Sequence, residues 1–312
     1  MATYYIAPTG DDTTGDGSEG NPWLNLFHAL DEMDQSDTVI VKQGIYLNQS
    51  TTISTVGQRL FSKKIIGESQ NAKDTILDFD GEVFQLVGTL AGSDDVSTFQ
   101  DITLRNIRNI AHSQGLFSSS VGTYNFLRVR FVDVRTGGST NSSSPSGGFF
   151  SVNSGTVNIE GCTFEKCYAR SEAFYYPIVT FSSNADGTFN MKNCSVFVSD
   201  ESAPSGSTNI QNIARLPTGG SSGTVNINNC ILYNKSGENP IIMQSVNTGV
   251  VVNVTNSCIN GYSSATNSDN EPVAVYNPVT DNVINQDPLF VDPDNGFFEP
   301  AANSPVRGLG SV

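Results

Sequence analysis

The chain has 312 residues and a formal net charge of −15, yet only 15% of its residues are charged. No run reaches the roughly 18 apolar residues that a transmembrane helix needs, and this charge without a basic stripe disfavours nucleic acid as a partner. The first residues lack the basic and apolar regions of a signal peptide, so we expect neither a membrane span nor a leader in this chain.

The N-terminal segment, residues 1–37, predicts a cap made of a short strand, an Asp/Gly-rich loop and one helix. Asn21 followed by Pro22 is typical of a helix N-cap and first turn, and Leu24, Phe27 and Leu30 would form one apolar face. We expect this helix to cover the open end of the structure that follows it.

An internal repeat begins near residue 102. The segments ITLRNIRN, YNFLRVRF, VNIEGCTF, FNMKNCSV, VNINNCIL and VNVTNSCI share one eight-position frame, and their sixth positions lie 22 to 36 residues apart. Positions one and three are apolar in every copy, which is the period of a β-strand. The first positions are Ile102, Tyr124, Val157, Phe189, Val225 and Val252.

The alternation breaks between positions three and six, so each copy must bend there. Four copies carry Asn before the break and one carries Gly, the residues that most readily adopt a left-handed backbone; Arg128 is the exception. The frame therefore predicts a strand, a one-residue corner and a second strand. The residues at position two form a column whose amides can stack as an Asn ladder: Asn125, Asn158, Asn190, Asn226 and Asn253.

A third short strand is predicted upstream of each copy, in VFQLVG, GLFSSS, GFFSVN, IVTFSS, IARLPT and IIMQSV, with VAVYNP as a further member. Three short strands per coil resemble the right-handed parallel β-helix of the pectate-lyase-like superfamily, and the resemblance covers nearly the whole chain. It implies an all-β single-stranded solenoid with an N-terminal capping helix. We expect one domain, with coils over 38–285 and a C-terminal cap over 286–312.

The five cysteines are predicted to be free and buried. Cys162, Cys194 and Cys230 share the sixth column, and Cys167 and Cys258 lie near it. Disulfides between neighbouring rungs stay an alternative, whereas zinc is disfavoured because no CxxC motif or nearby His completes a ligand set. We expect His28 and His112 to be surface or loop residues.

Three loops are rich in carboxylates and raise the question of calcium. They contain Asp11, Asp12, Asp16 and Glu19; Asp94 and Asp95; and Asp287, Asp292 and Asp294. Turn chemistry accounts for Asp and Gly in such loops, so we expect no cofactor and leave calcium open.

The resemblance implies a substrate groove over the first strand of each coil. The outward residues there would be Gln85, Ser118, Ser151, Thr180, Arg215 and Met243, with Asn153 nearby. Arg215 is the only ionisable member of this set. A β-eliminating lyase needs a base and a cation beside the substrate carboxylate, and a glycosidase needs two carboxyl groups. Neither set is present on the predicted face itself.

Neighbouring loops can supply the missing groups. Lys166 and Arg170 join Arg215 as candidate catalytic residues. The candidate glycan-binding residues are Ser151, Asn153, Glu172, Tyr175, Tyr176, Thr180, Asp200 and Glu201, although the two tyrosines can equally serve to pack their loop. A second basic cluster, Arg105, Arg108, Arg128 and Arg130, is interpreted as an ion-pair ladder with Asp101, Asp133 and Glu160.

Two functions follow as hypotheses. We favour a non-catalytic attachment protein, tailspike- or fibre-like, that presents a polar face to a glycan or to a partner capsid or surface protein. Buried free thiols suit assembly in a reducing cytoplasm followed by release, so under this hypothesis the protein is extracellular or on a virion surface, and a homotrimer is one expected assembly. The alternative is a polysaccharide lyase or glycoside hydrolase acting on an acidic polysaccharide.

Overall fold

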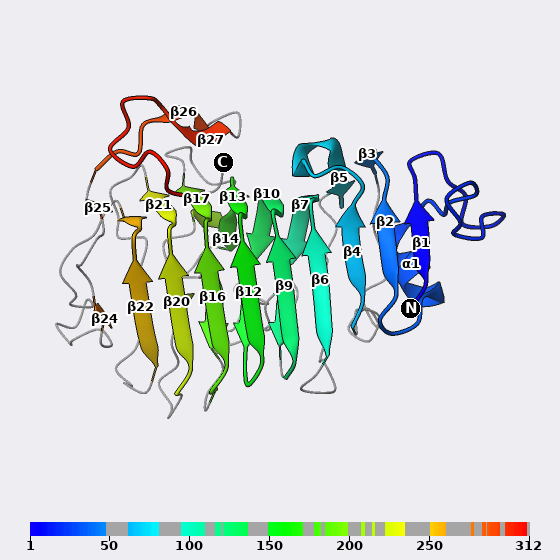
Figure 1. Cartoon of the computed structure of the whole chain (residues 1–312), viewed down its shortest axis with the longest axis horizontal. Coiled ribbons are helices and arrows are strands. Elements are labelled where there is room, and N and C mark those ends of the chain that lie inside the picture. Colours follow the sequence, from blue (N-terminus) through cyan, green and yellow to red (C-terminus); the bar gives the residue numbers. More distant parts are fainter. Residues whose placement is uncertain are drawn as a thin grey trace.

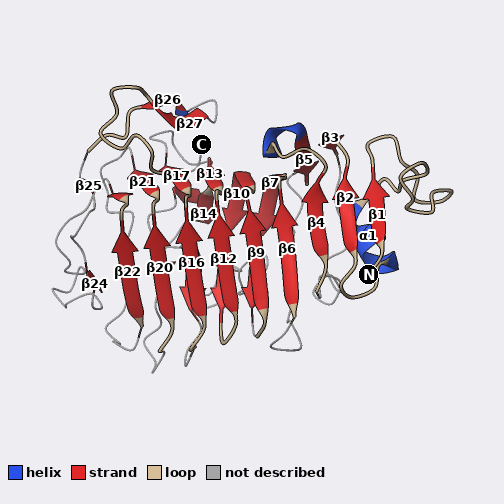
Figure 2. Ribbon diagram, in the orientation of Figure 1, coloured by secondary structure: helices blue, strands red, loops and turns tan. Residues whose placement is uncertain are grey.

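A computed structural model describes residues 1–47, 62–80, 95–109, 116–119, 121–136, 149–170, 178–181, 185–198, 207–209, 214–215, 222–234, 250–259, 276–277, 283–284, 286–293 and 297–310. None of the helices in these ranges has the length and apolarity that crossing a bilayer requires. The strands form three parallel sheets and one hairpin (Figures 1 and 2).

The ten-stranded sheet faces the viewer in Figure 1. Its strands, in spatial order, are β1 (Thr3–Ile6), β2 (Thr38–Val41), β4 (Lys64–Gly67), β6 (Val96–Gln100), β9 (Thr123–Leu127), β12 (Thr156–Glu160), β16 (Thr188–Lys192), β20 (Thr224–Asn228), β22 (Val251–Thr255) and β24 (Tyr276–Asn277).

The eleven-stranded sheet lies behind it. Its main path is β3 (Gly44–Tyr46), β5 (Thr75–Asp78), β7 (Thr103–Asn109), β10 (Arg130–Thr136), β13 (Thr163–Glu165), β17 (Ser195–Val198), β21 (Ile231–Asn234), β23 (Cys258–Ile259) and β25 (Val283–Ile284). Two further strands, β14 (Tyr168–Arg170) and β18 (Ser207–Asn209), pair with each other antiparallel, and β14 also pairs with β10.

The four-stranded sheet contains the first strands of successive coils, and a hairpin and two helices are the other elements of the described residues. The strands are β8 (Phe117–Ser119), β11 (Phe150–Val152), β15 (Val179–Phe181) and β19 (Ala214–Arg215). The hairpin is β26 (Phe290–Asp292) and β27 (Phe297–Pro300), and the helices are α1 (Leu26–Glu32) and the 3₁₀ helix η2 (Ala72–Asp74).

From β8 to β21, four successive coils visit the four-, ten- and eleven-stranded sheets in turn, which confirms the predicted right-handed parallel β-helix with three strands per coil. The predicted corner is also confirmed. Asn106, Asn193, Asn229 and Asn256 have φ between 49° and 57°, and Arg128 adopts the same left-handed conformation at 53°. The bend is therefore required by the coil itself, and Arg128 takes it although its side chain does not favour it.

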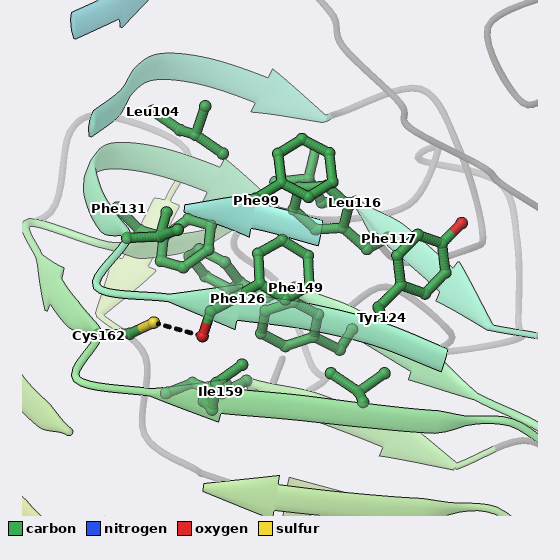
Figure 3. Packing of buried hydrophobic residues seen from close by; sticks show 14 of the residues in the cluster. Phe99, Leu104, Leu116, Phe117, Tyr124, Phe126, Phe131, Phe149, Ile159 and Cys162 are labelled. Atoms are coloured by element: carbon green, nitrogen blue, oxygen red, sulfur yellow. Dashed lines mark hydrogen bonds between the residues drawn. The ribbon is translucent and has the colours of Figure 1, made fainter. Parts of the chain in front are cut away.

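The interior is filled by stacked side chains from successive rungs. Phe126 lies 5.1 Å from Phe99 and 4.6 Å from Phe117 between ring centroids, and all three side chains are buried (Figure 3). The five cysteines are free and buried, as predicted. Burial raises the pKa of the Cys162 thiol, which donates to the Phe126 carbonyl at 3.3 Å (Figure 3), so the thiol stays protonated and unreactive.

The N-terminal cap differs from its prediction at the helix start. Asn25, not Asn21, is the N-cap: its side chain accepts a hydrogen bond from the Phe27 N–H at 2.8 Å. Residues before it stay extended because Trp23 bridges to Ile6 and its N–H bonds to the Tyr5 carbonyl. This loop therefore covers the free edge of β1, which would otherwise offer unpaired backbone groups to another chain.

Four of the predicted first strands are confirmed as β8, β11, β15 and β19. VFQLVG and IIMQSV lie outside the described residues. The assignment of VAVYNP was wrong: Tyr276–Asn277 pairs with β22, so it continues the ten-stranded sheet. Asn277 extends the position-two column of Asn residues, because it pairs with Asn253. The alternation of apolar residues in VAVYNP does not by itself distinguish a strand of this sheet from a first strand.

Candidate functional site

Three of the residues predicted for the first-strand face lie next to one another in the four-stranded sheet. Ser151 pairs in register with Thr180, and Thr180 pairs with Arg215, so these three residues form one row across the four-stranded sheet. Ser151 is only 7% exposed, whereas Asn153 is exposed at the strand end. Ser151 is therefore largely withdrawn from any ligand on this face.

The loop residues of that hypothesis do not join the row. Lys166 follows β13 with φ of 49°, and Arg170 ends β14, so both belong to the eleven-stranded sheet while Arg215 belongs to the four-stranded one. Glu172, Tyr175, Tyr176, Asp200 and Glu201 lie outside the described residues. The three catalytic candidates stay a prediction, divided between two sheets.

A different site lies on the outer face of the eleven-stranded sheet. Its cavity has a volume of about 220 Å³ and is formed by four segments that are far apart in sequence. One wall is η2 and the loop before it, the floor is the start of β10 and β13, and the other wall is β27. The lining residues are Gln70, Asn71, Ala72, Lys73, Arg128, Arg130, Gly161, Thr163, Phe297, Phe298 and Glu299.

The floor of this pocket carries two arginines whose carboxylate partners are buried. Arg128 donates from Nε to Asp101 Oδ1 at 2.6 Å and from Nη2 to Asp101 Oδ2 at 2.8 Å. Arg130 donates from Nη2 to Glu165 Oε2 at 2.9 Å. A guanidinium has five N–H donors, so these hydrogen bonds orient both groups and leave donors over for a ligand.

Lys73 is the third cation of the pocket. Its Nζ lies 4.0 Å from the centroid of the Phe297 ring, a cation–π contact between the two walls. Burial and the nearby Arg130 charge lower the pKa of Lys73, while Glu165 acts in the opposite direction. Burial likewise raises the pKa of Glu165, and Arg130 opposes that effect.

The β26–β27 hairpin is held over the sheet by four aromatic rings. Phe298 lies 5.8 Å from Phe197 and 5.5 Å from Phe290, and Tyr233 lies 5.9 Å from Phe197 and 6.1 Å from Phe290. Phe298 faces this cluster and is 4% exposed, whereas the adjacent Phe297 is 50% exposed at the pocket. Alternation along β27 thus uses one ring as an anchor and presents the other to solvent.

Arg128 and Arg130 were predicted from the sequence to be part of an ion-pair ladder, not of a pocket. The ladder exists with partly different partners: Arg128 pairs with Asp101 as predicted, Arg105 pairs with Asp78 at 2.6 Å, and Glu160 pairs with Lys192 at 3.0 Å. Lys73 and Phe297 were missed because nothing local connects residue 73 with residue 297. The adjacent phenylalanines in NGFFEP were the one available signal.

Three aspartates of the N-terminal loop accept hydrogen bonds from backbone N–H groups. Asp11 accepts from the Thr13 N–H at 2.7 Å, Asp12 from the Leu24 N–H at 2.8 Å, and Asp16 from the Ser18 N–H at 2.9 Å. Within the ranges that the structure describes, no three His, Cys, Asp or Glu side chains are grouped so as to hold a metal ion. Turn formation is therefore sufficient to explain Asp11 and Asp16, whereas Asp12 connects the loop to the residues that precede α1.

No family model and no curated protein matches the chain. Among solved structures, pectate lyase Pel9A matches at 14% identity with a TM-score of 0.47, over 98% of this chain and 90% of that chain. A rhamnogalacturonan lyase matches at 12% identity and a TM-score of 0.45, over 84% of this chain and 75% of that one. The GH136 lacto-N-biosidase from Eubacterium ramulus matches at 12% identity and a TM-score of 0.35, over 83% of this chain and 56% of that one. Such values concern the course of the backbone, and we transfer no residue's role from these proteins.

Proposed function

We propose that the protein is a carbohydrate-binding β-helix that holds a carboxylate-bearing sugar residue, such as a uronate, in the pocket between η2 and β27. One observation carries the proposal: Lys73, Arg128 and Arg130 converge on a single cavity of about 220 Å³. A single carboxylate placed there would receive charge-assisted hydrogen bonds, which are about twice as strong as neutral ones.

The remaining lining favours a sugar over a simple anion. Gln70 offers an amide donor and acceptor for hydroxyl groups, and the half-exposed Phe297 ring offers an apolar surface at the rim. The Asn71 amide is engaged within η2, where it accepts from the Lys73 N–H and donates to Asp74. Pockets that combine apolar contact with a few placed polar groups select an orientation as well as a charge. The overall charge of −15 repels polyanions at long range, so we expect short oligomers to bind better than long ones.

Titration calorimetry with oligogalacturonate and with a neutral oligosaccharide of equal length tests the proposal. We expect the acidic oligomer alone to bind, and Lys73→Gln to weaken it about tenfold, which corresponds to about 1.4 kcal/mol. Lys192→Gln is the matched control because it removes the same charge from an exposed ion pair on the ten-stranded sheet. Equal binding of both sugars, or equal effects of both substitutions, would contradict the proposal.

A second candidate function is β-elimination, which the placement of Lys73 and Arg130 in the lining of one pocket favours. An unprotonated Lys73 amine would take the proton beside the sugar carboxylate while Arg130 neutralises that carboxylate. The electron pair left behind would form the C=C bond and expel the glycosidic oxygen, which takes a proton from water. Absorbance of the unsaturated product tests it: loss in Lys73→Gln but not in Arg215→Ala places the base in this pocket, and the reverse result favours the first-strand face.

The same proposal includes an attachment role. The protein would present the pocket on a virion or cell surface, as a rod made of three identical chains. An uncatalysed, reversible uronate complex supports attachment, whereas product release supports the lyase. Light scattering of the purified chain tests the trimer, and a monomer at micromolar concentration would remove it from the proposal.

A further inference from the structure

The outer face of the ten-stranded sheet is a regular array of small polar side chains. In-register pairing across β6, β9, β12, β16, β20 and β22 aligns one row of β-branched residues and, two residues on, a row of one Thr and five Asn. The first row is Val96, Thr123, Thr156, Thr188, Thr224 and Val251. The second row is Thr98, Asn125, Asn158, Asn190, Asn226 and Asn253.

The second row is held rigid by hydrogen bonds along its own length. Asn158 donates from Nδ2 to Asn125 Oδ1 at 2.9 Å, and Asn190, Asn226 and Asn253 each donate to the preceding Asn at 2.8 Å. Each amide thus keeps one N–H and one lone pair for another partner. The threonines are stiff at χ1 because they are β-branched, so binding would cost these side chains little conformational entropy.

This face is neutral although the chain carries a charge of −15. Neither row contains an ionisable side chain, and in the adjacent third row Glu160 and Lys192 cancel each other at 3.0 Å. Figure 1 shows no described element in front of these strands. Charge complementarity therefore points to an uncharged partner.

The dimensions disfavour a second protein chain as that partner. Six rungs spaced about 4.8 Å apart, with strands of five residues, give a face of roughly 300 Å². A stable protein interface buries about 800 Å² on each side. The outward residues of β6 to β22 also include no aromatic ring on which a sugar could stack.

The spacing of the array matches that of frozen water. Hydrogen bonds of about 2.75 Å at tetrahedral angles place alternate water molecules about 4.5 Å apart, close to the rung spacing of about 4.8 Å. The mismatch accumulates to only about half a hydrogen-bond length over five rungs. Hydroxyl and amide groups can anchor such waters, while the Thr and Val methyl groups order those between them.

We propose that this Thr/Asn face orders a layer of water and binds ice. The proposal concerns a face other than the pocket and does not depend on sugar binding. The two rows of this face differ from the surface around the pocket because they carry no ionisable side chain and because the Asn side chains are fixed by hydrogen bonds to one another.

Thermal hysteresis, ice-crystal shaping and partition into growing ice test the proposal on the full chain. We expect the wild-type protein to shape ice and Thr188→Tyr to lose most of that activity, because a bulky ring at the centre of the row lifts the face off the lattice. Thr188→Lys is a second variant should the first fold poorly. Thr13→Tyr is the matched control, because Thr13 is exposed in the N-terminal loop.

Circular dichroism melts show which variants are folded. Ice shaping that Thr188→Tyr and Thr188→Lys abolish and Thr13→Tyr preserves supports the proposal. It is overturned if the wild-type protein leaves ice growth unchanged, if a folded Thr188 variant keeps full activity, or if the protein is retained by microcrystalline cellulose and not by ice.

Discussion

The ten- and eleven-stranded sheets are built from the same coils but present opposite chemistry outward. On the ten-stranded sheet, polar side chains bond to their own kind along a row, as Asn190 does to Asn158. On the eleven-stranded sheet, cations and carboxylates bond between rungs, as Arg130 does to Glu165, and η2 and β27 border the same face. A face made only of repeats is flat and periodic, whereas added segments are needed to make a pocket.

The two proposed activities lie on different faces of the molecule, ice binding on the ten-stranded sheet and sugar binding on the eleven-stranded sheet. The periodic face fits a periodic partner, and the pocket fits a single charged group. Substitutions that act on the shared interior should damage both, and substitutions on one face should leave the other intact.

Phe126→Ala should have the largest effect because the ring supports both sheets from inside. It is fully buried and packs on Phe99, Phe117 and Phe150, with centroids 4.6 to 5.1 Å away. A buried Phe→Ala change costs about 3–5 kcal/mol of unfolding free energy. Urea denaturation measures this loss of unfolding free energy. A loss below about 1 kcal/mol would show that the stacked aromatic rings contribute little to the stability of the coils.

Asp101→Asn should come next, because the carboxylate that orients Arg128 is 1% exposed. We expect a loss of about 2 kcal/mol, the usual range for hydrogen bonds to a charged group, together with weaker binding of the acidic oligosaccharide. Asn tolerates the φ of 56° at this position.

Glu160→Gln is the control for that change on the ten-stranded sheet. Its carboxylate is 47% exposed and its Lys192 partner 56%, so the pair should contribute less than about 1 kcal/mol. Equal losses in the two amide variants would contradict the difference we draw between the two faces.

Phe298→Ala should loosen the hairpin and weaken uronate binding about tenfold, or about 1.4 kcal/mol. The ring anchors β27 through Phe197 and Phe290 and does not contribute to the main core. We expect ice shaping to be unchanged. Unaltered sugar affinity in this variant would mean that the hairpin is not a functional wall of the pocket.

The smallest expected effect is an acid-dependent one at Asp78. Burial alone would raise the pKa of Asp78, but hydrogen bonds from the Asp80 N–H, Asn106 and Arg105 together hold it below its usual 3.8. Because the pKa of Asp78 is lower in the folded than in the unfolded protein, its ionised carboxylate stabilises the folded state above pH 3.8. That contribution is lost as the pH falls below 3.8 and through the folded-state pKa. Asp78→Asn should therefore flatten the acid limb of a stability-versus-pH curve, and an unchanged limb would contradict this assignment.

Much of the fold was predictable because a solenoid repeats its local constraints. The apolar columns through Tyr124 and Phe126, the Asn corners and the Asn ladder each follow from a pattern of eight residues. The helix start was mispredicted because Asn21–Pro22 has the local chemistry of an N-cap, but Trp23 is held in an extended bridge to Ile6.

The candidate site was far less predictable. Arg128 and Arg130 stood out as a basic cluster, yet a ladder and a ligand pocket contain the same arginines. What distinguishes them is the presence of Lys73 and Phe297, which belong to no repeat and meet at 4.0 Å across the chain.

The sequence by itself determined the coil, its corners, its buried thiols and the Asn ladder, because each depends on residues close together in one repeat or on the same position in the next. Only the tertiary structure decided that η2 and the β26–β27 hairpin enclose a pocket lined by Lys73, Arg128, Arg130 and Glu299, that Asn25 caps the helix, and that Lys166, Arg170 and Arg215 lie on two different sheets. Those outcomes depend on contacts between segments up to more than two hundred residues apart, for which a local pattern carries no information.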